Sequence, residues 1–199
     1  MLAGPLIFVD IDTQRDFLEP SGSLFIYGSQ VIRPILALLT KTARSHGIPV
    51  IATACAHTLD EEDPEPFPPH CLVGTEGKER IAETAWKDGV VLSPNSQFPS
   101  TSALPSHLTL EKTRYDLFSR ADATEILARY AKNRPTFAVY GVATDYCVRA
   151  VVLGLRALDY RVAVVVDAVW AIDQAHEVDQ FAEFVERGAV LIHSEVVCG

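Results

Sequence analysis

Short apolar runs alternate with amphipathic stretches along nearly the whole chain, and this alternation constrains the fold more than any other feature. Runs such as PLIFVDI (5–11), IPVIATA (48–54) and PTFAVYG (135–141) lack polar alternation, as expected of strands that are buried on both faces. Between the first two runs, QVIRPILALLTKTARSH (30–46) carries apolar residues at helical spacing and ends at Gly47, a residue suited to a helix C-cap. We therefore predict a doubly wound α/β fold with a mostly parallel sheet of about six strands, flanked by helices.

The rest of the chain continues the same pattern. Further strands are expected at 90–94, around 108–112, at 161–168 and at 188–193, and further helices at 121–132, 145–158 and 175–186. The segment 58–89 is the least regular, with prolines at 64, 66, 68 and 69, and a loop of this length is often functional. With 199 residues and no internal repeat, residues 1–199 are predicted to form a single domain.

Composition and charge exclude several kinds of partner. The formal net charge of −9 argues against a nucleic acid or an anionic membrane and is compatible with a small-molecule substrate. The N-terminus lacks the positive region of a signal peptide, and no apolar run approaches the length that spans a bilayer. We therefore expect a cytoplasmic protein and a homo-oligomer whose size the sequence does not fix. In a reducing compartment its four cysteines are expected to be catalytic, metal-binding or inert.

Reactive side chains follow four of the predicted strands. In open α/β sheets, ligands bind beyond the carboxyl ends of the strands. Asp10 ends the first strand, Cys55 and His57 follow the second, Lys112 follows the run LTLE, and Cys147 follows 135–141. Each residue alone has an ordinary explanation, such as a turn cap, a surface lysine or a core cysteine. Their convergence on one edge of the sheet indicates a functional site.

The thiol of Cys147 is the candidate nucleophile. It lies in YGVATDYCVRAVVLGL (140–155), where a strand is expected to lead into a helix, and a helix N-terminus favours the thiolate. Asp10 could accept the thiol proton, and Lys112 could hold the resulting charges in place. The backbone N–H groups near Ala143 and at Cys147 could form an oxyanion hole.

These motifs resemble those of the isochorismatase-like cysteine hydrolases over nearly the whole chain, most weakly at 58–106. VDIDTQRDFLEPSGSL is similar to the family's V-D-x-Q-x-D-F…G-S-L start, GVATDYCVRAVVLGLRALDYRVAVVVDA to its nucleophile segment, and EKTRYDLF to the segment of its lysine. The resemblance implies that Asp10, Lys112 and Cys147 are catalytic and that a cis peptide bond precedes Ala143. It also implies that the thiolate attacks a carboxamide, that ammonia leaves, and that water hydrolyses the thioester.

Within this family the chain looks most like the nicotinamidases, which implies conversion of nicotinamide to nicotinate and ammonia in NAD salvage. The alternative enzyme is another small-amide hydrolase, acting on N-carbamoylsarcosine, maleamate or a ureidoacrylate. Isochorismate hydrolysis is not expected, because that vinyl-ether chemistry does not use the cysteine. A catalytically silent binding domain is the third possibility, and the intact set of Asp10, Lys112 and Cys147 argues against it.

The resemblance also implies a metal site, with one departure. Nicotinamidases carry a D-x-H pair after the second strand and a W-P-x-H-C motif, to which His57 and the His70 of FPPHC (67–71) correspond. Cys55 stands where the family has the aspartate. A thiolate and two imidazoles suit Zn²⁺, which we expect as the cofactor, better than manganese or magnesium. The alternatives are a site without metal, or a ligand from Asp60, Glu62 or Asp63.

Aromatic residues and one short loop bear on the substrate. Phe17, Phe67 and Tyr115 are candidates to hold a flat ring, with ordinary core positions as the alternative. Phe67 replaces the tryptophan usual in nicotinamidases. The short spacing from Lys112 to Phe118 resembles that of metal-free amidases such as N-carbamoylsarcosine amidase, whereas many nicotinamidases have a longer insertion there.

Overall fold

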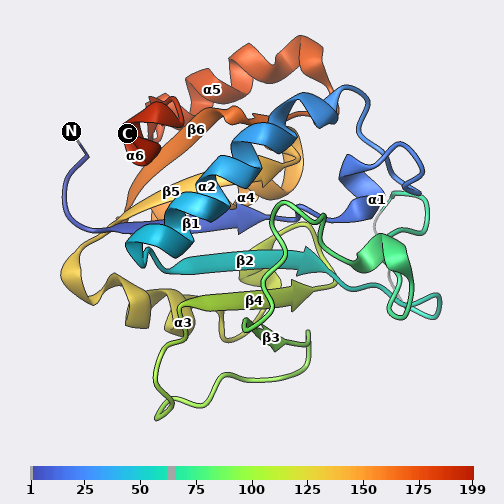
Figure 1. Ribbon diagram of the computed structural model, residues 1–199, viewed down its shortest axis with the longest axis horizontal. Helices are drawn as coiled ribbons and strands as arrows, with labels where there is room; N and C mark the ends of the chain where they lie inside the picture. The colour runs from blue at the N-terminus through green and yellow to red at the C-terminus, as the bar shows by residue number, and fades with distance from the viewer. Residues whose placement is uncertain (1, 62–65) are drawn as a thin grey trace.

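The computed structural model describes residues 2–61 and 66–199, and its centre is a parallel sheet. Within the described residues the sheet has seven strands in the order β3-β4-β2-β1-β5-β6-β7 (Figure 1). The predicted doubly wound fold is confirmed, each of the seven segments expected to form strands overlaps an observed one, and the count is close to the stated total of about six. The strands are β1 (Leu6–Ile11), β2 (Val50–Cys55), β3 (Val90–Leu92), β4 (His107–Lys112), β5 (Thr136–Val142), β6 (Arg161–Trp170) and β7 (Val190–Ile192).

Helices connect the strands and cover both faces of the sheet (Figure 1). The predicted C-cap of α2 is confirmed, because Gly47 has a φ of 64° and its N–H donates to the carbonyl of Ala43. No helix of the described residues is long and apolar enough to cross a membrane. The α-helices are α1 (Arg15–Leu18), α2 (Arg33–His46), α3 (Ala123–Tyr130), α4 (Arg149–Ala157), α5 (Glu177–Glu186) and α6 (Glu195–Cys198).

Each face of the sheet has its own apolar core. On one face, Leu36 of α2 packs in the same cluster as Phe8 of β1. On the other face, Ile126 of α3 and Val151 of α4 belong to the cluster that contains Val9 of β1. Successive residues of β1 therefore enter opposite cores, which explains why the central strands are apolar without interruption.

The strand order reverses at β1, and this reversal places the reactive side chains together. β2, β4 and β3 lie on one side of β1, and β5, β6 and β7 lie on the other. Such a reversal opens a crevice at the carboxyl ends of the strands. Cys55 ends β2 and Lys112 ends β4, where the two residues are register partners. Cys147 follows β5 after a short turn.

Gly141 keeps β5 close to β1 at this edge of the sheet. Its φ is 115°, and a Cβ built on it would lie 2.1 Å from the carbonyl oxygen of Ile11. Only glycine fits a backbone that approaches its neighbour so closely. The register between β5 and β6 also shifts between Val139 and Gly141, as at a β-bulge. The end of β5 is thus shaped by backbone sterics immediately before the segment that carries Cys147.

His107, at the start of β4, has a buried imidazole that packs against an aromatic ring. Its side chain stacks on Trp86 with ring centroids 4.7 Å apart, and the guanidinium of Arg44 lies over Trp86. Neither ring nitrogen has a partner in the described part of the chain. Burial, reinforced by the charges of Arg80 and Arg44, lowers the pKa of His107 to about 3.

This buried imidazole predicts a component of acid sensitivity. Because the folded pKa lies below the unfolded value of about 6.5, the unfolded state binds the extra proton, and stability falls as the pH drops below about 6.5 towards 3. We expect His107→Phe to reduce the loss of unfolding free energy between pH 7 and pH 5 by about 2 kcal/mol. Urea unfolding at the two pH values measures this difference. His46→Phe, at an exposed position of α2, is the control, and an equal acid loss in wild type and His107→Phe would refute the assignment.

Candidate active site

The site is built on a buried ion pair between Asp12 and Lys112. Lys112 Nζ donates to Asp12 Oδ2 at 2.8 Å, and neither side chain is more than 1% exposed. Asp12 also accepts a hydrogen bond from the hydroxyl of Thr53 at 2.6 Å. Burial raises the pKa of Asp12, the charge at Cys55 adds to this rise, and Lys112 opposes it. Burial alone would lower the pKa of Lys112. The negative charges of Asp12, and of Cys147 and Cys55 when ionised, raise it.

Asp10, predicted from the sequence as the acid of the site, is engaged elsewhere. Its carboxylate accepts hydrogen bonds from Thr13 Oγ1 at 2.9 Å and from the guanidinium of Arg80. It is fully buried, and Arg80 forms an ion pair with it. The structure thus separates Asp10 from Lys112 and brings Asp12 to the position expected for Asp10.

The pleat of β1 gives the physical reason. Asp10 lies on the same face of β1 as Phe8, which enters the core beneath α2. Lys112 lies on the same face of β4 as Leu110, which enters the core beneath α4. Asp10 and Lys112 therefore project from opposite faces of the sheet. Asp12 lies beyond the strand and has a φ of 47°, so a local turn carries its carboxylate to Lys112.

Cys147 lies on the turn that joins β5 to α4. Residues Thr144–Val148 (η5) form one turn of π-helix, in which the N–H of Val148 donates to the carbonyl of Ala143 at 3.1 Å. The peptide bond between Val142 and Ala143 is cis, as the resemblance implies. The sulfur of Cys147 lies 3.8 Å from Lys112 Nζ. The predicted oxyanion hole at Ala143 and Cys147 remains a prediction.

Cys55 occupies the middle of the site. Lys112 Nζ lies 3.2 Å from its sulfur, and Asp12 Oδ2 lies 3.8 Å away. The side-chain amide of Gln14 holds its backbone by accepting from the N–H at 2.7 Å and donating to the carbonyl at 2.8 Å. A hydrogen bond from Cys147, aided by the charge of Lys112, lowers the pKa of Cys55. The same bond, together with burial, raises the pKa of Cys147.

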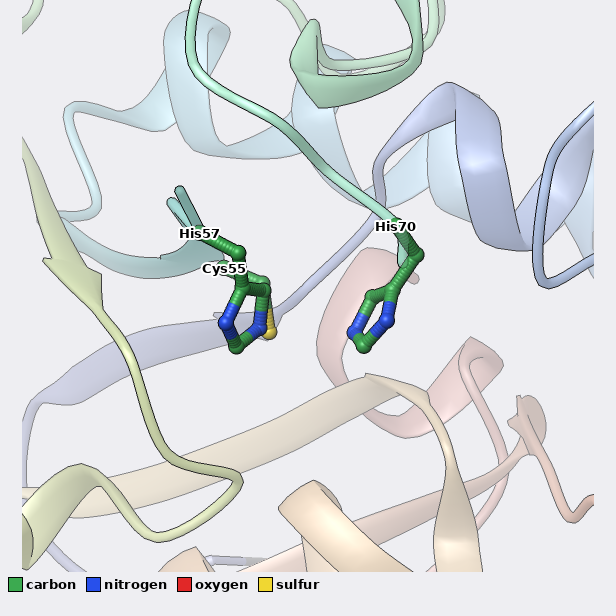
Figure 2. A group of neighbouring side chains, drawn as sticks. All are labelled: Cys55, His57 and His70. Carbon is green, nitrogen blue, oxygen red and sulfur yellow. The ribbon is translucent and has the colours of Figure 1, made fainter. Parts of the chain in front are cut away.

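The structure also brings together the three residues predicted to bind metal. The ligand atoms of Cys55, His57 and His70 all lie within 4.8 Å of one another, and Figure 2 shows the two imidazoles beside the sulfur. His70 Nδ1 pairs with the carbonyl of Pro68 at 2.8 Å. His57 Nε2 is buried and has no hydrogen-bond partner in the described residues. An orphaned nitrogen beside a second imidazole and a thiol fits a zinc site.

Glu61 is a residue of this group that the sequence did not single out. Both of its carboxylate oxygens lie 3.1 Å from His57 Nδ1, and the backbone N–H of Thr58 donates to one of them. A carboxylate on Nδ1 fixes the tautomer that leaves Nε2 available for a metal. Its position four residues after His57 was the sequence feature that could have suggested this contact. Of the acids considered from the sequence, Asp60 is exposed, and Glu62 and Asp63 lie outside the described residues.

An apolar pocket adjoins the two cysteines. Phe17, Phe67 and Tyr115, predicted to hold a flat ring, all line it. Tyr146 lines it too, although the sequence did not suggest this, and its ring makes edge contacts with those of Phe67 and Tyr115 at centroid distances of 5.1 and 6.1 Å. Within the described residues the lining contains no lysine, arginine, aspartate or glutamate. The full lining is Phe17, Leu24, Ile26, Cys55, Phe67, His70, Tyr115, Val142, Ala143, Tyr146, Cys147 and Ile172.

The chain also matches the sequence model of a known protein family. The isochorismatase domain matches residues 6–196. The chain belongs to the isochorismatase family.

Individual family members give more detail. A probable inactive nicotinamidase of Arabidopsis thaliana is 28% identical over 171 residues, which cover 81% of this chain and 78% of that protein. The nicotinamidase/pyrazinamidase PncA of Bacillus subtilis has a TM-score of 0.78 at 23% identity, covering 95% of this chain and all of that one. The pyrazinamidase of Pyrococcus horikoshii, solved in complex with zinc, has a TM-score of 0.75 at 23% identity, covering 94% of this chain and 98% of that one. The two solved structures establish the shared fold.

The isochorismatase-family start motif also points to Asp12. When D-x-Q-x-D-F is aligned on Gln14 and Phe17, it begins at Asp12, whereas Asp10 belongs to the preceding strand. Asp16, the second aspartate of the motif, accepts from the backbone N–H of Cys71 at 2.6 Å and holds the segment after His70. The spacing of the motif was therefore the sequence signal that could have identified Asp12.

Proposed function

We propose that this isochorismatase-family protein is an amidohydrolase that converts nicotinamide to nicotinate and ammonia through a thioester at Cys147. The observation that carries the proposal is the buried set of Asp12, Lys112 and Cys147 beside an apolar pocket with aromatic walls. A flat, uncharged ring amide suits such walls. A carboxylate-bearing amide would need a cation in the pocket, and the only nearby ammonium among the described residues, Lys112, is already paired with Asp12.

Asp12 is the proposed general base. It shares the ammonium of Lys112 with the sulfur of Cys147, and burial raises its pKa, which makes it a better acceptor for a thiol proton than an ordinary carboxylate. Lys112 fixes the carboxylate at 2.8 Å and keeps a positive charge within 3.8 Å of the sulfur. The thiolate formed at Cys147 is therefore stabilised as the proton moves to Asp12.

The remaining steps use the same groups. The sulfur attacks the carboxamide carbon, and the backbone N–H groups of Ala143 and Cys147 are the proposed donors to the oxyanion. Asp12 returns its proton to the nitrogen, the C–N bond breaks and ammonia leaves. Asp12 then takes a proton from water, whose oxygen attacks the thioester, and nicotinate departs as the proton returns to the sulfur of Cys147.

Cys55, His57 and His70 are the proposed ligands of a zinc ion. A bound Zn²⁺ would supply a Lewis-acid position for the pyridine nitrogen of the substrate. The donor set of one sulfur and two imidazole nitrogens favours zinc over manganese or magnesium. The zinc complex of the Pyrococcus pyrazinamidase supports this proposal. Glu61 would hold His57 in the ligating tautomer.

One observation favours a second candidate, a metal-free amidase acting on a small non-aromatic amide. The connection after Lys112 is short, because Asp116 accepts from the N–H of Phe118 and begins the 3₁₀ turn Leu117–Ser119 only a few residues beyond β4. Many nicotinamidases have a longer insertion here. A silent binding domain is disfavoured, since burying Asp12 and Lys112 has no evident use in such a protein.

The substrate is tested by ammonia release. We expect turnover of nicotinamide and pyrazinamide and little turnover of N-carbamoylsarcosine, maleamate or a ureidoacrylate, because among the described residues the pocket lining has no lysine or arginine to pair with their carboxylates. A coupled glutamate dehydrogenase assay measures the ammonia, and Cys147→Ala, which removes the proposed nucleophile, is the blank. Preferred turnover of a carboxylate-bearing amide would replace the nicotinamide proposal with the second candidate.

The assignment of the base is tested by two isosteric variants. Asp12→Asn removes the proton acceptor, so we expect the acylation rate to fall by about 10² to 10⁴. Asp10→Asn, in an equally buried position, is the matched control and should lower the rate by less than about tenfold, because its carboxylate is bonded to Thr13 and Arg80. Rapid-quench kinetics measures acylation, and circular dichroism checks the fold. If both folded variants lose the same activity, Asp12 is not the specific base.

The metal site is tested by elemental analysis and by zinc affinity. We expect about one zinc per chain, which is lost in His57→Ala and in His70→Ala. Glu61→Gln should weaken zinc binding by about 10- to 100-fold, measured by competition with a chromophoric chelator. Asp173→Asn alters a similar carboxylate–histidine pair, with His176 on the surface, and should leave affinity unchanged. Equal affinities in the Glu61 and Asp173 variants would show that Glu61 does not orient His57.

A further inference from the structure

Cys55 places a second thiol beside the same lysine as the proposed nucleophile. Lys112 Nζ lies 3.2 Å from Cys55 Sγ and 3.8 Å from Cys147 Sγ, so one ammonium contacts both sulfurs. Both thiols also line the same apolar pocket. An aspartate at position 55, as in the family motif, would offer no sulfur here.

The two sulfurs approach from separate elements. Cys55 is the last residue of β2, and Cys147 lies in the π-helical turn after β5. β1 lies between β2 and β5 in the sheet, so a bond between the sulfurs would span the strand-order reversal. A disulfide holds its two sulfurs about 2 Å apart, so its formation would draw the side chains of Cys55 and Cys147 together beside Lys112.

A small oxidant can reach the pair through the substrate pocket. Both cysteines line that pocket, whereas Cys71 is buried outside its lining and Cys198 lies at the end of α6. Hydrogen peroxide is uncharged and smaller than the proposed amide substrate, so a pocket that takes this substrate would also admit peroxide. Of the four cysteines, Cys55 and Cys147 are therefore the two that share both a contact with Lys112 and a place in the pocket lining.

We propose that Cys55 and Cys147 form a peroxide-responsive disulfide, a modification site that reversibly blocks the nucleophile. Formation of this bond consumes the sulfur of Cys147 and the sulfur that Cys55 offers to a metal. One oxidation therefore disables both halves of the site. Disulfides of this transient, sensing kind are the sort found in reducing compartments.

The chemistry balances with hydrogen peroxide as the oxidant. The sulfur of one cysteine attacks the peroxide, the O–O bond breaks, and a sulfenic acid and water form. The sulfur of the second cysteine attacks the sulfenic sulfur, the S–S bond forms, the S–O bond breaks, and a second water leaves. Two thiols are oxidised by two electrons in total, and one peroxide is reduced to two waters.

Peptide mapping of the peroxide-treated full-length protein, as purified and after chelation, tests the proposal. We expect the wild type to lose two hydrogens and to yield a peptide pair linked through Cys55 and Cys147, which dithiothreitol separates. In Cys55→Asp, Cys147 has no resolving thiol, so it should accumulate sulfinic and sulfonic acids that dithiothreitol does not reverse. Cys198→Ala is the matched control and should behave as wild type.

This experiment measures the mass of linked peptides. Its result therefore does not depend on whether nicotinamide is the substrate. The linked pair in either metal state supports the proposal. Its absence in both states overturns it, as does accumulation of sulfinic acid at Cys147 equally in wild type and Cys55→Asp. A disulfide that joins Cys147 to Cys71 or Cys198 instead would also overturn it.

Discussion

The Asp12–Lys112 ion pair is the interaction on which the rest of the site depends. Neither charge reaches solvent, so each is tolerable only because the other lies 2.8 Å away. Asp12 follows β1 and Lys112 ends β4, with β2 between them, so the pair ties three strands at their carboxyl ends. Losing either partner would leave a buried charge uncompensated, at a cost of about 3–5 kcal/mol. The fold and the proposed chemistry therefore share one electrostatic constraint.

Cys55 links this ion pair to the proposed metal site, because its sulfur lies beside both. It lies 3.2 Å from Lys112 on one side, and it groups with His57 and His70 on the other. A carboxylate in its place would bring a hard oxygen ligand, whereas the thiol brings a soft ligand and a redox-active atom. The aromatic walls formed by Phe67, Tyr115 and Tyr146 lie beside this junction. The proposed metal site, the proposed substrate pocket and the proposed thiol chemistry thus all involve Cys55.

Much of this arrangement follows from the sequence, because the carboxyl ends of parallel strands lie along one edge of the sheet. That rule alone groups Lys112, Cys147, Cys55 and His57 from their places in the sequence. The rule gives the edge of the sheet and not the face, so it placed Asp10 beside Lys112, where the structure has Asp12. The positive φ of Asp12 cannot be read from period-two alternation. Glu61 and Tyr146 were missed for a different reason. Their roles depend on side-chain contacts across loops, which carry no periodic signal.

The central position of β1 has a consequence for how the chain is made. β1 pairs with β2 on one side, but its other neighbour, β5, spans Thr136–Val142. During synthesis from the N-terminus, one edge of β1 stays unpaired until the chain has grown past residue 142. An apolar strand with an open edge is prone to pair with other chains. The growing chain therefore presents this open apolar edge until β5 has been made, and the segment that carries Cys147 follows directly after β5.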